Sequence, residues 1–122
     1  IAAGGSGQVA MGYIGTFDSG ATWNGYLSVI TDVFANQPLI TTVQLNAFDD
    51  PLEDSKSDCG YDRCGGFGDF NDIIIDQHGR VWFGLAHNVA GELGIFGTLA
   101  KGPNLRGVGP LLDIPLGGNS TL

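Results

Sequence analysis

The segment Thr16-Phe17-Asp18-Ser19-Gly20-Ala21-Thr22-Trp23 carries the strongest local information about the fold. Asp18 can accept backbone N–H hydrogen bonds across its own turn, and Gly20 permits a backbone conformation that a Cβ would forbid. Thr22 returns the chain to β geometry, and Trp23 offers a large ring for packing against a neighbouring element. The segment therefore predicts a tight turn between two β-strands.

Strand-like runs lie on both sides of this turn. Residues 8–14 precede it, and residues 23–31, which are rich in aromatic and β-branched side chains, follow it. A third run covers residues 39–45, directly after Pro38. The first part of the chain is therefore expected to form an antiparallel sheet.

The second half of the chain follows an irregular acidic stretch at residues 47–68. Residues 70–76 are predicted to form a strand whose Ile73-Ile74-Ile75 centre is buried on both faces. A tight turn at residues 76–79 is expected to join this strand to the next one as a hairpin. The remaining runs cover residues 80–87, 93–99 and, more weakly, 111–116.

The composition excludes several classes of protein. Glycine accounts for 21 of 122 residues, which disfavours long helices because each interior glycine costs about 1 kcal/mol relative to alanine. The 13 acidic and 5 basic side chains give a formal charge of −8, which argues against nucleic acid as a partner. Apolar stretches are far shorter than the roughly 20 residues of a membrane span, so membrane insertion is not expected. A turn-rich, all-β chain remains.

Two cysteines, Cys59 and Cys64, lie in the irregular stretch. They could form a disulfide, half of a metal site or two free thiols; a zinc site would need two more ligands, and the only histidines are His78 and His87. We favour the disulfide, which implies an oxidising compartment outside the cytoplasm. Since residue 1 is Ile, we expect either a removed leader or the downstream piece of a longer chain.

The segment at residues 16–23 fits the Asp-box pattern (Ser/Thr)-x-Asp-x-Gly-x-Thr-Trp at every defined position. The matching residues are Thr16, Asp18, Gly20, Thr22 and Trp23. It resembles the signature of bacterial-neuraminidase repeats in the sialidase-like β-propellers. A second segment, from Cys59 to Trp82, is similar to the segment with two cysteines, Gly-Asp-Phe, a strand and an Asp-x-x-Gly turn in secreted sialidase-like proteins.

The resemblance implies an all-β fold of about two four-stranded antiparallel blades, from the C-terminal portion of a propeller. The first blade would span residues 7–46 and lack its inner strand, an acidic cysteine-containing loop would span 47–68, and the second blade 69–116. A Gly-x-Val-x-(Met/Phe)-Gly match between residues 7–12 and 79–84 supports two units. Two blades cannot close a ring, so the rest of a longer chain or copies of this one would complete it.

The position of the Asp box departs from the family pattern. The box usually joins the third and fourth strands of a blade, whereas here the runs at 23–31 and 39–45 both precede the irregular stretch. Either the box has moved to the preceding turn, or one of these runs is not a blade strand. The Thr31-Asp32 region is a candidate for a degraded second box.

The resemblance implies three alternative functions. The first is a structural or glycan-binding module that is secreted or lies at the cell surface. The second is part of a sialidase-type glycoside hydrolase, and the third is a two-blade lectin that closes by oligomerisation. A sialidase holds its substrate carboxylate with an arginine cluster, and it uses a tyrosine nucleophile paired with a glutamate and an acid/base aspartate.

The sequence assigns no residue of this chain to catalysis. Its three arginines are Arg63, Arg80 and Arg106, and nothing spaces them for a bidentate clamp. We expect them to be a loop residue, a hairpin-exit residue and a surface residue, respectively. Tyr13 and Tyr26 are expected to pack within strands, and Glu92 to be a solvated turn residue.

The acidic stretch also offers oxygen ligands for Ca2+. The candidate ligands are Asp49, Asp50, Asp54 and Asp58. The stretch fails the EF-hand pattern, because Lys56 and Cys59 stand where a ligand and a glycine are required, so a solvated loop without a cofactor is favoured. His87 is expected to be satisfied by a backbone partner, and Asn119-Ser120-Thr121 is a formal glycosylation sequon.

Overall fold

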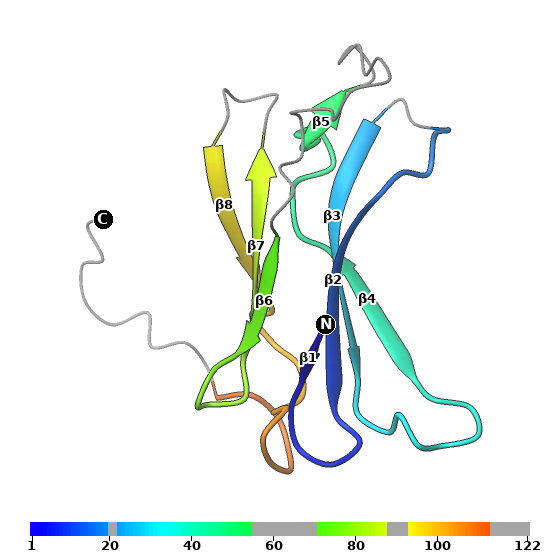
Figure 1. Cartoon of the computed structure of the whole chain (residues 1–122), viewed down its shortest axis with the longest axis vertical. Coiled ribbons are helices and arrows are strands. Elements are labelled where there is room, and N and C mark those ends of the chain that lie inside the picture. The colour runs from blue at the N-terminus through cyan, green and yellow to red at the C-terminus, as the bar shows by residue number, and fades with distance from the viewer. Residues whose placement is uncertain (20–21, 55–70, 88–92, 113–122) are drawn as a thin grey trace.

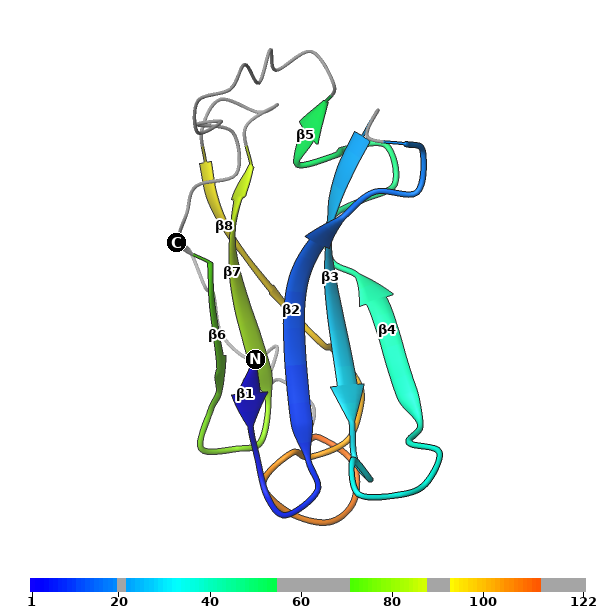
Figure 2. The same ribbon diagram turned by 45° about the vertical axis from the view of Figure 1, so that its right-hand side comes forward.

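The fold consists of two antiparallel sheets that do not close on each other (Figures 1 and 2). The computed structural model describes residues 1–19, 22–54, 71–87 and 93–112, and these residues contain no helix. The predicted all-β class is therefore confirmed. The strands are β1 (Ala2–Ala3), β2 (Val9–Gly15), β3 (Thr22–Ile30), β4 (Ile40–Gln44), β5 (Glu53–Asp54), β6 (Asp72–Ile75), β7 (Val81–His87) and β8 (Leu93–Thr98).

The first sheet is built around the turn of the Asp box. Strands β2 and β3 form a hairpin in a register that runs from Val9 opposite Ile30 to Gly15 opposite Asn24. Strand β1 pairs with the far side of β2, and β4 pairs with the far side of β3. The short strand β5 pairs with the start of β3. The sheet order is therefore β1-β2-β3-β4, with β5 attached to β3.

The second sheet is a meander in the order β6-β7-β8. The hairpin predicted at residues 76–79 is confirmed, since Ile75 lies opposite Val81 and the N–H of Gly79 donates to the carbonyl of Asp76 at 3.1 Å. Gly79 has a φ of 79°, and an added Cβ would collide with the side chain of Asn104. A glycine is therefore required at this turn.

The two sheets face each other across a shared apolar core. The main cluster of buried side chains joins Leu27 and Val29 of β3 to Ile75 of β6 and Val81 of β7. A second cluster joins Leu52 to Phe83 and Leu85 of β7. Both clusters use alternate residues of their strands, as expected for sheets with one face on a core.

Several details differ from the sequence-based expectations. Ile74 is 54% exposed, so the centre of β6 is not buried on both faces. Among the described residues β6 pairs only with β7, and its Ile73 and Ile75 face the core. Strands β1 and β5 lie where no strand was expected. Leu111 and Leu112 are not in a strand, and the second sheet has three strands in the described residues. The number of blades stays a prediction.

Residues near the two ends of the described chain are joined by direct hydrogen bonds. The side-chain amide of Gln8 donates to the carbonyls of Asn104 at 3.0 Å and Gly107 at 3.1 Å. The N–H of Gly5 donates to the carbonyl of Leu105 at 2.7 Å. The turn between β1 and β2 is therefore fixed to the loop that follows β8.

Candidate functional site

The Asp box forms a turn organised by a single carboxylate. One oxygen of Asp18 accepts the N–H of Thr22 at 2.8 Å and the hydroxyl of Thr16 at 2.7 Å. The other oxygen accepts the hydroxyl of Thr22 at 2.7 Å. Ser19 has a φ of 60° within this turn, and Gly20 lies outside the described residues. These bonds support the predicted structural role of Asp18 and its neighbours.

These hydrogen bonds also set the protonation of the carboxylate. The hydroxyl of Thr16, followed by the hydroxyl and N–H of Thr22, lowers the pKa of Asp18 from 3.8 to about 2. Asp18 therefore stays ionised even at pH values well below neutral. A carboxylate in this state fits a structural turn better than proton transfer at neutral pH.

A second aspartate organises the β6–β7 turn in a similar way. One oxygen of Asp76 accepts the N–H groups of His78 at 2.8 Å and Arg80 at 3.0 Å, and the other accepts the indole N–H of Trp82 at 3.0 Å. Partial burial raises the pKa of Asp76, but these three hydrogen bonds and the charge of His78 lower it overall. The Asp-x-x-Gly spacing over residues 76–79 predicted this turn, but it did not indicate the bond from Trp82.

The described arginines bind backbone carbonyls. Arg80 lies at the exit of the β6–β7 hairpin, as expected, and it is buried. Its guanidinium donates to the carbonyls of Leu99 and Leu112. The exposed Arg106 donates to the carbonyls of Ile75 and Asp76 at 2.8 Å each. These contacts connect the loop after β8 to the β6–β7 hairpin. Both guanidinium groups thus have a structural role.

Three aromatic rings gather on the outer face of the first sheet, next to the Asp box. Tyr26 is buried, and its ring stacks on that of Tyr13 with centroids 5.6 Å apart. The ring of Phe17 meets Tyr26 edge-on at 5.4 Å. Tyr13 is 41% and Phe17 89% exposed, so the buried ring supports two rings that reach solvent. We call Tyr13, Phe17 and Tyr26 the aromatic platform.

Neutral polar side chains border the aromatic platform. The Tyr13 hydroxyl lies 3.4 Å from that of Ser28, which lies 2.7 Å from that of Thr42. Asn24 accepts a hydrogen bond from the amide of Gln44 at 3.4 Å. Strand alternation and register place all of these residues on the platform's face. Among the described side chains, the hydroxyl of Tyr26 is buried without a hydrogen-bond partner.

Comparisons with known proteins give no information about the site. No family model, curated protein or solved structure matches the chain. The likeness to sialidase-like propellers therefore rests on the two sequence segments alone. In the part of the chain that the structure describes, no helix is long and apolar enough to cross a membrane.

The described structure covers only two side chains of the four calcium candidates. Asp49 and Asp50 are exposed, and a carboxylate oxygen of Asp50 lies 3.0 Å from Nε2 of the buried His87. His87 thus has a side-chain partner that the sequence did not indicate. Outside the described residues lie Asp58, Cys59, Arg63, Cys64, Glu92 and the sequon, together with the side chain of Asp54. The described residues contain no group of three side chains that could hold a metal ion.

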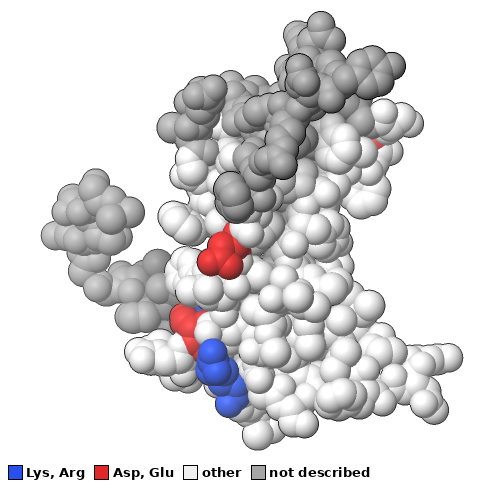
Figure 3. Space-filling model, in the orientation of Figure 1, with Lys and Arg blue, Asp and Glu red and all other residues white. Residues whose placement is uncertain are grey.

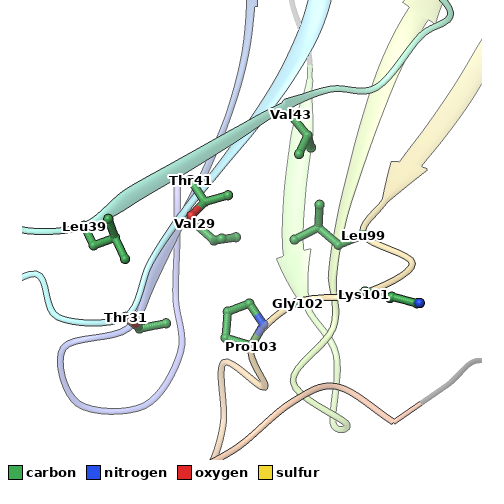
Figure 4. A pocket seen from close by; sticks show the side chains of 9 residues that line it. All are labelled: Val29, Thr31, Leu39, Thr41, Val43, Leu99, Lys101, Gly102 and Pro103. Carbon is green, nitrogen blue, oxygen red and sulfur yellow. The ribbon is translucent and has the colours of Figure 1, made fainter.

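A pocket of about 340 Å3 opens on the inner face of β3 and β4 (Figure 4). Val29, Thr41 and Val43 form one wall, and Leu99 and Pro103 lie across from them. Its remaining lining residues are Thr31, Leu39, Lys101 and Gly102. The pocket therefore lies on the opposite side of the sheet from the aromatic platform.

Proposed function

We propose that the chain is a glycan-binding and structural module of a sialidase-like propeller, located at the cell surface or outside the cell. The aromatic platform carries this proposal. Its exposed rings, Tyr13 and Phe17, are fixed by the buried Tyr26. Rigid rings of this kind offer contact area at a low cost in conformational entropy, and they provide a flat surface for the apolar face of a sugar ring.

The groups around the platform favour a neutral sugar. Hydroxyl and amide side chains donate and accept hydrogen bonds, as the hydroxyls of a sugar do. The exposed Thr42 and the partly buried Gln44 supply such groups on the same face. Phe17 is followed directly by Asp18, whose lowered pKa keeps it ionised. This negative charge disfavours an acidic sugar.

A titration with two related sugars tests the proposal. Lactose, which is neutral, and 3′-sialyllactose, which is anionic, are added to the isotopically labelled chain, and amide shifts are followed by NMR. We expect lactose to shift the amides of Tyr13 and Phe17, with a Kd on the order of 1 mM. Weaker binding of 3′-sialyllactose is expected at low salt.

Two substitutions of exposed phenylalanines locate the binding surface. Phe17→Ala is expected to weaken lactose binding at least tenfold, whereas Phe96→Ala, which removes another exposed ring from β8, is expected to leave it unchanged. Lactose shifts that are absent, or that persist unchanged in Phe17→Ala, would overturn the proposal. Tighter binding of 3′-sialyllactose would overturn its neutral-sugar part.

The sialidase-type alternative gains no support from the described residues. Substrate carboxylates are held by guanidinium groups that are free to form bidentate contacts. The guanidinium groups of Arg80 and Arg106 donate to backbone carbonyls instead. The proposal therefore contains no catalytic step and no cofactor.

A further inference from the structure

A long uncharged segment surrounds strand β4. No Lys, Arg, Asp or Glu occurs from Val33 to Phe48, although the chain has a formal charge of −8. Large apolar side chains in this segment are nevertheless exposed, namely Phe34, Leu39, Ile40 and Phe48. The surface around β4, at the lower right of Figure 3, is correspondingly free of charged side chains. This part of the surface suits contact with another apolar surface better than contact with water.

Strand β4 is also an edge strand with free backbone groups. Within the described residues β4 pairs only with β3. The N–H of Leu45 donates to the carbonyl of Gly25, and the alternation of antiparallel bonding then directs the N–H and C=O groups of Ile40, Thr42 and Gln44 away from β3. Natural edge strands are usually protected by charges, proline or a bulge. The sequence Ile-Thr-Thr-Val-Gln of β4 contains neither a charge nor a proline.

We propose that β4 pairs with β4 of a second copy of this chain, antiparallel about a twofold axis at Thr42. This register pairs all five residues of the strand, with Ile40 opposite Gln44 and Thr41 opposite Val43. Each copy offers the same surface, as a twofold interface requires. The two first sheets then form one continuous sheet across the axis.

The distribution of charge permits a second copy in this register. Two chains of formal charge −8 repel each other, but the paired segments are neutral, so the contact itself brings no like charges together.

The mass of the assembly in solution tests the interface. Native mass spectrometry and light scattering of the chain at about 50 μM are expected to give a species of twice 12.7 kDa. Thr42→Pro removes a central N–H of the free edge and none of the backbone hydrogen bonds to β3, although it does remove the hydroxyl contact with Ser28. It is therefore expected to give a folded monomer. Circular dichroism verifies that the β structure is retained.

A matched pair of lysine substitutions keeps the test decisive if Thr42→Pro does not fold. Ile40 and Ile74 are each 54% exposed on an edge strand, β4 and β6 respectively. Ile40→Lys is expected to weaken the dimer at least tenfold, because it places a charge at each end of the pairing. Ile74→Lys is expected to leave the dimer unchanged.

Three outcomes would overturn the proposal. They are a chain that stays monomeric at 50 μM, a dimer unaffected by Ile40→Lys, and a dimer disrupted by Ile74→Lys as strongly as by Ile40→Lys. The interface does not depend on the aromatic platform, which lies on the outer face rather than the edge of the sheet. A dimer that binds no lactose would therefore support the interface and contradict only the proposed function.

Discussion

The ring of Phe83 lies directly against Gly12 across the space between the two sheets. A Cβ added at Gly12 would lie 2.5 Å from a ring carbon of Phe83, which is far closer than side-chain atoms normally approach. Phe83 is itself buried in the second core cluster. Because Gly12 has no side chain, β2 can pack this closely against Phe83 of β7.

Gly12→Ala is expected to lower the free energy of unfolding by about 1–3 kcal/mol, because Phe83 or a strand must shift to admit the methyl group. Urea unfolding measures the change. Gly94→Ala is the matched control, since an added Cβ there meets no atom within 4 Å. Equal effects of the two substitutions would show that Gly12 does not limit the packing.

The depressed pKa of Asp18 predicts an acid-sensitive turn. The ionised carboxylate stabilises the folded state fully above its unfolded pKa of 3.8, and this contribution is lost as the pH falls towards the folded value of about 2. An NMR titration of the Asp18 carboxyl carbon is expected to show a midpoint near 2. In Asp18→Asn, the dependence of stability on pH between 4 and 2 should become weaker, whereas a midpoint near 3.8 in the unsubstituted chain would contradict the turn geometry.

Asp76→Ala and Trp82→Phe separate the contributions to the second turn. Asp76→Ala leaves the N–H groups of His78 and Arg80 and the Trp82 indole without their acceptor, and we expect a loss of about 1–3 kcal/mol in unfolding free energy. Trp82→Phe removes only the indole bond and should cost about 1 kcal/mol. The double variant is expected to be less destabilised than the sum; strict additivity would indicate that the indole bond contributes nothing.

The buried and exposed arginines should respond differently to the same change. Arg80→Met leaves the carbonyl of Leu99 without its donor in a buried position and the carbonyl of Leu112 without its donor in a partly buried one. We expect a cost of about 1–3 kcal/mol in thermal or urea unfolding. Arg106→Met also removes two bonds to carbonyls, but water can replace this exposed guanidinium. We expect its effect to be well under 1 kcal/mol, and the reverse order would refute the assigned roles.

Local sequence signals predicted much of the fold. The Asp box placed the turn between β2 and β3, and the Asp-x-x-Gly spacing placed the hairpin at residues 76–79, because both turns depend on side chains within a few residues. Ile74 was mispredicted for the opposite reason. Three consecutive isoleucines do not indicate which faces of a strand are covered, because that depends on what packs against each face of the sheet. Ile73 and Ile75 face the core, whereas Ile74 lies on the opposite face.

The candidate sites were harder to predict, because they depend on contacts between distant residues. His87 and Asp50 are 37 positions apart, and no periodicity links them. Tyr13 and Tyr26 were correctly expected to pack in strands, but the register of β2 and β3 was needed to show that their rings stack. The burial of Arg80 likewise depends on a loop that follows β8.

The link between Gln8 and the carbonyls of Asn104 and Gly107 has a kinetic consequence. It joins positions that are 96 and 99 residues apart, and closing a loop of that length costs about 4 kcal/mol of chain entropy. Such contacts cannot form until most of the chain between them has been ordered. The β1–β2 turn should therefore dock onto the loop after β8 late in refolding, and the chain should fold on the millisecond-to-second timescale of topologies dominated by long-range pairing.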